Sequence, residues 1–164
     1  MKRQLIWAGL ALALSVAGWN IWSNERILAD GRVALLELAP VDPRSLMQGD
    51  YMALNYALAN ALRGGSDERR ADGYAIVRLD ERGIAKLART QPAAQPLAAG
   101  EIAIRYRVRD GRARIATNAF FFQEGRAQEF SAARYGEFRI GENGEPHLTA
   151  LLDADLRRLG ENRY

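Results

Sequence analysis

The chain opens with a long apolar run and continues as short segments in which apolar and polar residues alternate. Residues 5–22 carry no charge over 18 positions, and they follow Lys2 and Arg3. At about 1.5 Å per residue, a helix of this length spans roughly 27 Å, close to the hydrocarbon thickness of a bilayer. The preceding positive charges favour a cytoplasmic N-terminus. We therefore expect a signal-anchor helix within residues 1–23, with the rest of the chain in the bacterial periplasm.

A cleaved signal peptide is the alternative interpretation of the same segment. Ser15, Val16 and Ala17 form a pattern of small residues that a signal peptidase could cut. The apolar run continues beyond this point to Trp22, which favours an uncleaved anchor. In both cases the remainder of the chain is expected to be exported.

The exported part has the short strands and frequent turns of a mainly antiparallel domain. We expect a connector over residues 24–31, one domain over 32–159 and a tail over 160–164. The predicted class is β-rich α+β, with one short helix after the N-terminal transmembrane helix. The predicted elements are strands at 32–39, 51–58, 74–80, 84–89, 101–109, 112–119, 134–140 and 147–152, a capped turn at 42–49, a helix at 124–134 and a closing helical turn at 153–159.

The clearest local prediction is a hairpin around Asp110 and Gly111, the preferred pair for a two-residue type I′ turn. This turn would place Arg107 opposite Arg114 and Arg109 opposite Arg112. Alternation then gives an apolar face of Ile104, Tyr106, Val108, Ala113 and Ile115. The other face carries five arginines: Arg105, Arg107, Arg109, Arg112 and Arg114.

Opposed like charges destabilise a sheet, so something negative should cover this arginine face. Internal carboxylates such as Glu124, Glu129 and Glu137 are one possibility. Anionic lipid headgroups or an acidic patch on a membrane partner are the others. The run Phe120, Phe121 and Phe122 cannot be buried on one strand face, so at least one ring is expected to be exposed.

The composition limits the kinds of catalysis, metal site and partner that the chain can have. The chain has no Cys and a single His, which excludes thiol catalysis and multi-histidine metal sites. Beyond residue 23, the 21 basic and 20 acidic residues leave a net charge of +1, which does not favour nucleic acid as a partner. We predict neither a metal nor a cofactor, and we expect His147 to be a surface residue.

Residues 49–56 read G-D-Y-x-x-L-x-Y, with Gly49, Asp50, Tyr51, Leu54 and Tyr56 at the fixed positions. This segment resembles the signature of the GDYXXLXY family. The approach Pro40 to Leu46 and the aromatic segment ending in Glu124 and Gly125 are similar to those of the same family, although Gln123 stands where a proline is usual. The resemblance extends to about Leu152. It implies a small membrane-anchored exported domain that accompanies a multi-spanning inner-membrane protein, and it implies no particular reaction.

A carboxylate site is the competing functional hypothesis. Asp42, Asp50 and Glu124 could converge as the site of an envelope hydrolase, although Asp42 and Asp50 are also well placed to cap turns. A pocket lined by Tyr51, Tyr56 and the phenylalanine run would instead favour binding of a lipid or small ligand. The leading hypothesis remains a non-catalytic accessory or interaction module. Its expected contacts are the five arginines and Phe120, Phe121 and Phe122.

Overall fold

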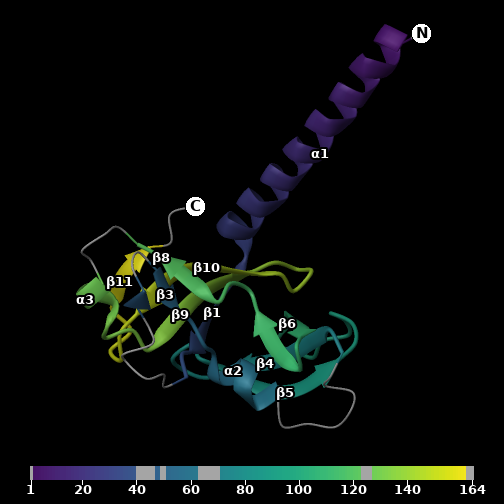
Figure 1. The fold of residues 1–164 in the computed structure, drawn as a ribbon. Coiled ribbons are helices and arrows are strands. Elements are labelled where there is room, and N and C mark those ends of the chain that lie inside the picture. Colours follow the sequence, from purple (N-terminus) through teal and green to yellow (C-terminus); the bar gives the residue numbers. More distant parts are fainter. Residues whose placement is uncertain (1, 40–46, 49–50, 63–70, 123–126, 162–164) are drawn as a thin grey trace.

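The computed structural model describes residues 2–39, 47–48, 51–62, 71–122 and 127–161. A long N-terminal helix projects from a β-rich domain (Figure 1). All strand pairs within the three sheets are antiparallel. The predicted β-rich, mainly antiparallel class is therefore confirmed, and the described residues contain three helices rather than the two that were expected.

Helix α1 (Lys2–Asp30) includes the predicted segment 5–22 and continues through the residues assigned to the connector. Its polar side chains bond within the helix: the Ser15 hydroxyl donates to the Ala11 carbonyl and the Asn20 amide to the Val16 carbonyl. In the described part of the chain, no helix combines the length and the apolar character needed to cross a bilayer. The structure thus confirms the helix and does not support its membrane-spanning role.

The first sheet has the order β1-β9-β10-β11. Its strands are β1 (Arg32–Glu37), β9 (Tyr135–Ile140), β10 (Pro146–Leu152) and β11 (Arg158–Glu161). The end of α1 is fixed to this sheet, because the Arg139 guanidinium donates to the Ala29 and Gly31 carbonyls at 3.3 Å.

The second sheet has the order β5-β4-β6-β7. Its strands are β4 (Gly73–Leu79), β5 (Ala85–Gln91), β6 (Glu101–Arg109) and β7 (Arg112–Ile115). Two backbone contacts join it to the first sheet. The Leu35 amide donates to the Gly83 carbonyl at 3.0 Å, and the Arg105 amide donates to the Gly144 carbonyl at 2.8 Å.

The third sheet is small and has the order β2-β3-β8. It consists of β2 (Met47–Gln48), β3 (Tyr51–Ala53) and β8 (Ala119–Phe121). Two short helices, α2 (Ala57–Ala61) and α3 (Ala127–Phe130), lie beside the sheets.

One hydrophobic core joins the three sheets and α2. Phe138 of β9 is fully buried and meets the Tyr56 ring edge-on, with 5.5 Å between the ring centroids. Leu36, Ile104 and Phe120 bring side chains from each sheet into the same core. Burial of this shared apolar surface is the main source of the domain's stability.

Several elements differ from the sequence-based expectation. The strand predicted at 51–58 ends at Ala53, and the chain then forms α2, where Leu58 and the C-cap residue Leu62 are buried four residues apart. That spacing places both side chains on one helical face. The predicted helix at 124–134 ends at Phe130, and its first residues lie outside the described chain.

The closing helical turn predicted at 153–159 is wrong. The Asp153 carboxylate accepts the amides of Asp155 and Arg157, both at 2.9 Å, and turns the chain back. The segment that follows pairs with β10 as β11, so the last described element is a strand. Asp153 is therefore the side-chain acceptor of a tight turn, a common role for this residue type.

Candidate functional site

The predicted arginine hairpin is present. Asp110 and Gly111 have φ values of 54° and 69°, and Arg107 pairs with Arg114 while Arg109 pairs with Arg112. Two successive positive φ values are the requirement of a type I′ turn. The opposite face is the core face that alternation predicted, with Ile104, Tyr106 and Ile115 no more than 2 % exposed.

β7 is shorter than predicted because the chain turns at Ala116, whose φ of 49° lies in the left-handed region. This turn directs the chain away from β6 and into β8. Alanine seldom adopts such a conformation, so the sequence carries no signal for it. The result is a hollow between the hairpin and β8.

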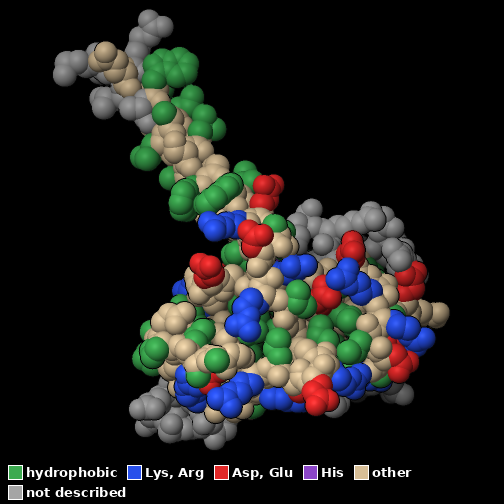
Figure 2. Space-filling view, turned by 180° about the vertical axis from the view of Figure 1, so that it is seen from behind, with side chains coloured by type: hydrophobic (Ala, Val, Ile, Leu, Met, Phe, Trp, Pro, Cys, Tyr) green, Lys and Arg blue, Asp and Glu red, His purple; other side chains and the backbone are tan. Residues whose placement is uncertain are grey.

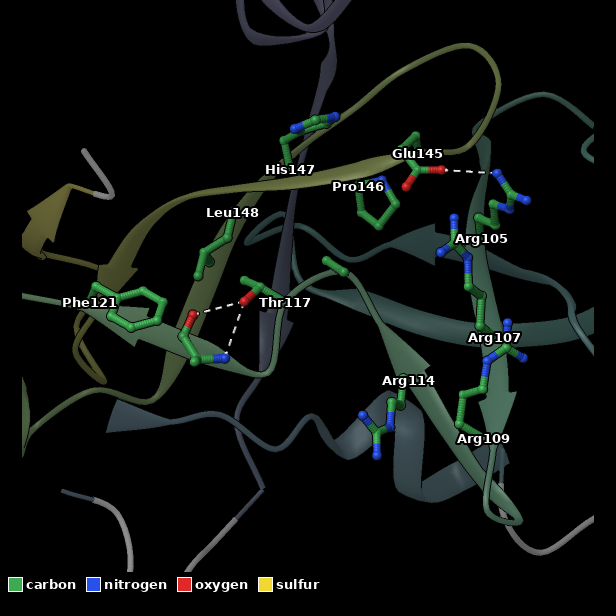
Figure 3. Close-up of a pocket in the computed structure, with 12 residues that line it drawn as sticks. Arg105, Arg107, Arg109, Arg114, Thr117, Phe121, Glu145, Pro146, His147 and Leu148 are labelled. Carbon is green, nitrogen blue, oxygen red and sulfur yellow. Dashed lines mark hydrogen bonds and ion pairs between the residues drawn. The ribbon is translucent and has the colours of Figure 1, made fainter. Parts of the chain in front are cut away.

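This hollow is a groove of about 570 Å³. In Figure 3 the arginines stand along one side, Phe121 lies at the other end, and the start of β10 crosses between them. The groove-lining residues are Arg105, Arg107, Arg109, Arg114, Ala116, Thr117, Ala119, Phe121, Glu145, Pro146, His147 and Leu148. Arg112, the fifth arginine of the hairpin, does not line it.

The groove's positive charge is only partly balanced within the domain. Glu145 contacts Arg105 at 3.3 Å, and Asp72 contacts Arg109 at 3.2 Å. Asp110, which is 90 % exposed, approaches Arg114 only to 3.9 Å. Within the described part of the chain, Arg107 makes no ion pair within 4 Å, so the centre of the arginine row carries an uncompensated charge.

The carboxylate of Asp72 is held in its charged form. The Val108 amide donates to it at 2.7 Å and is the main cause of a pKa below the usual aspartate range. The Arg109 guanidinium lowers this pKa further. Asp72 thus fixes the outer end of the arginine row, and Arg107 acts on it through a weaker Coulomb attraction without direct contact.

The aromatic run divides as alternation predicts. Phe120 is 1 % exposed and Phe121 is 66 % exposed. Phe122 packs against Phe130 with 5.1 Å between their ring centroids. Of the three rings, that of Phe121 lines the groove. Its centroid lies 6.0 Å from that of the tilted Tyr51 ring.

Residues of the G-D-Y-x-x-L-x-Y segment contact the stretch from Thr117 to Phe121, part of which lines the groove. Tyr56 is 2 % exposed, and its hydroxyl donates to the Thr117 carbonyl at 2.9 Å. The Leu54 amide donates to the Asn118 carbonyl at 2.7 Å, and Tyr51 pairs with Phe121 between β3 and β8. Tyr51 is partly exposed beside Phe121, whereas Tyr56 is buried in the core. Gly49 and Asp50 lie outside the described residues.

One of the carboxylates proposed to cover the arginines, Glu137, does not do so. Glu137 is bound instead to Arg158 at 2.7 Å and to the Thr149 hydroxyl at 2.9 Å. The three hydrolase candidates, Asp42, Asp50 and Glu124, all lie outside the described residues. Among the described residues, no three His, Cys, Asp or Glu side chains gather as a metal site.

Three residues of this site were not predicted from the sequence: Glu145 and His147, which line the groove, and Asp72, which pairs with Arg109. Glu145 and His147 reach the groove because the turn between β9 and β10 docks on β6, which is a tertiary contact without a local signal. His147, expected at the surface, is half-buried, and its buried Nε2 atom has no hydrogen-bond partner among the described residues. Asp72 reaches Arg109 across the sheet, and nothing in its local sequence indicates this pairing.

A comparison with known families gives one result. The family model described as GDYXXLXY protein matches residues 13–151, most of the chain. No curated protein and no solved structure matches the chain.

Proposed function

The chain belongs to the GDYXXLXY family, and on this premise we propose that it is a membrane-anchored periplasmic accessory module. Its partner is a multi-spanning inner-membrane protein, and its contact surface is the arginine-lined groove with the exposed ring of Phe121. The observation that carries the proposal is the row of four groove arginines with the unpaired Arg107 at its centre.

The chemistry of the groove favours binding over catalysis. Arginine stays protonated at all ordinary pH values, so it does not exchange protons with a substrate. Its planar guanidinium is instead well suited to paired hydrogen bonds with carboxylates. A partner that supplies negative charge would relieve the repulsion between the opposed arginines and gain these bonds.

The surface of α1 supports membrane attachment. Apolar side chains stand exposed along the helix outside the domain (Figure 2). Ile6, Leu12 and Trp19 are each more than 60 % exposed. An exposed apolar surface of this extent is typical of contact with a membrane or another protein. Trp22 marks the lower end of this surface, where Arg26 lies 5.5 Å from its ring.

A pull-down from the native membrane tests the proposal. The tagged full-length chain would be extracted in mild detergent, and co-purifying proteins and lipids identified by mass spectrometry. We expect a stoichiometric multi-spanning protein, retained by Arg112→Glu and lost from a variant carrying both Arg107→Glu and Arg114→Glu. Recovery of the wild-type chain without such a protein would refute the proposal, as would equal recovery with both variants.

A further inference from the structure

We infer that the groove binds an extended acidic segment of a protein, in which carboxylates alternate with other residues and an apolar side chain reaches Phe121. This inference rests on the function proposed above and specifies the part of the partner that the groove recognises.

The spacing of the arginines is the first argument. Arg105, Arg107 and Arg109 occupy every second position of β6, so they repeat along the groove at about 6.6 Å. An extended polypeptide presents every second side chain on one face with the same repeat. Carboxylates at alternate positions of such a segment would therefore run in register with the arginines, with one meeting Arg107 and its neighbours sharing Arg105 and Arg109 with Glu145 and Asp72.

The pair formed by Arg107 and Arg114 supplies the central contact. The two residues lie directly opposite each other in adjacent strands, and both line the groove. Directly opposed residues have their Cα atoms about 4.5–5.5 Å apart, close enough for one carboxylate to accept hydrogen bonds from both guanidinium groups. The adjoining positions already carry internal carboxylates, Glu145 on Arg105 and Asp72 on Arg109.

The remaining walls fit a polypeptide better than a simple anion. Phe121, Ala119 and Leu148 form an apolar end beyond the arginines. An apolar side chain at one end of a bound segment can occupy this apolar end, which a simple anion cannot do.

The bound segment is recognised through side chains rather than added to β8 as another strand. The Thr117 hydroxyl donates to the Ala119 carbonyl at 2.9 Å and accepts the Ala119 amide at 3.2 Å. These bonds, drawn in Figure 3, occupy backbone groups of β8 that a new strand would need. Specificity must then come from the arginines and Phe121.

The position of the groove favours a protein over the lipid surface. Asp30 lies eight positions after Trp22 in the helix, or about 12 Å farther along at the usual rise. If Trp22 marks the interface, the domain begins beyond the screening length of about 8 Å at physiological ionic strength. Arg139, the β9 partner of His147, is bonded to the end of α1. In Figure 3 the row of Arg105, Arg107 and Arg109 leads away from β10.

Peptide binding to the full-length protein in detergent micelles tests the inference. The probe is a fluorescein-labelled octapeptide in which three aspartates alternate with threonines and a leucine stands at one end. A second peptide of the same composition has its aspartates in one contiguous run. We expect anisotropy to show tighter binding of the alternating peptide and a loss of about 10-fold or more in Arg107→Glu.

Arg112→Glu is the matched control, because it changes the net charge of the same hairpin outside the groove. It should change the affinity by less than about 2-fold, well under the 1.4 kcal/mol that a tenfold change represents. Circular dichroism checks the fold of each variant, and Arg107→Gln replaces Arg107→Glu if the latter does not fold. Equal affinity for both peptides, or equal weakening by both charge reversals, would overturn the inference.

An experiment with vesicles distinguishes a protein segment from a lipid surface as the ligand of the groove. Phosphatidylglycerol vesicles that bind the protein through Arg107, with no binding of the alternating peptide, would overturn the inference in favour of a membrane surface. A pull-down that still depends on Arg107 while the peptide fails would leave the proposed function intact and eliminate only the extended acidic segment.

Discussion

Arg107 and Arg114 face each other directly across the β6–β7 pair, and among the described residues the one ion pair of these two side chains is that of Arg114 with the exposed Asp110 at 3.9 Å. Opposed like charges destabilise an antiparallel pair by a few tenths of a kcal/mol to about 1 kcal/mol. The domain therefore carries this cost in its isolated state. An external anion that joins the two side chains would remove it, which relates the local repulsion to the proposed binding role.

Arg114→Glu is expected to stabilise the isolated domain by about 0.2–1 kcal/mol, because it converts the repulsion into a cross-strand ion pair. The same change should weaken binding of the alternating peptide. Urea denaturation followed by circular dichroism measures the first effect, and anisotropy measures the second. A variant that loses stability would show that Arg114 already has a favourable role in the free protein.

A second prediction concerns the buried carboxylate of Glu101. Its side chain is 2 % exposed and forms ion pairs with Arg89 and Arg78. The Arg89 guanidinium, with the Ala98 amide, lowers the pKa of Glu101 to about 2 from its usual 4.5. Because the folded-state pKa is depressed, the stabilisation is complete above about pH 4.5 and is lost as the pH falls toward about 2.

Glu101→Gln should therefore be less stable than the wild type at pH 7, and the difference should shrink on acidification. Chemical denaturation at pH 7, 4 and 2.5 measures this profile. Glu81→Gln, at the exposed turn between β4 and β5, is the control and should leave the stability unchanged. A difference that stays constant across this pH range would exclude the ion pair as its cause.

A third prediction concerns Gly144, which docks the β9–β10 turn on β6. Its φ is 79°, and an added Cβ would lie 2.9 Å from the Tyr74 ring and 3.1 Å from the Ala103 carbonyl oxygen. Gly144→Ala should destabilise the domain by about 1–3 kcal/mol through backbone strain and overpacking. It should also weaken peptide binding, since this turn carries Glu145 and leads to His147.

Gly83→Ala separates the effect of backbone strain from that of overpacking. Gly83 has the same φ of 79°, and an added Cβ there would meet nothing within 4 Å. Its cost should be limited to strain, about 1 kcal/mol. Equal destabilisation of both variants in urea would show that contact with Tyr74 is not important.

Local chemistry determined which parts of this fold could be predicted. The Asp110–Gly111 turn sets the register of its own hairpin, so the arginine face and the core face follow from sequence alone. The groove does not, because it needs the left-handed Ala116 and the docking of the β9–β10 turn. Glu145 and His147 are close to the arginines only through that docking. The strand predicted at 51–58 failed since Leu58 and Leu62 also fit a helical spacing.

Tyr56 gives the last prediction, which concerns the role of the family segment. Its buried hydroxyl holds the Thr117 carbonyl at 2.9 Å, and Thr117 in turn bonds the backbone of Ala119 at the groove. Tyr56→Phe should cost about 0.5–1.5 kcal/mol of stability and lower the affinity for the alternating peptide.

Tyr51→Phe is the control. It removes a hydroxyl from the same segment at a side chain that is 36 % exposed, and it should change neither the stability nor the affinity. Urea denaturation and peptide anisotropy of both variants decide the matter: if Tyr56→Phe loses stability with unchanged affinity, the segment supports the core alone and does not position the groove.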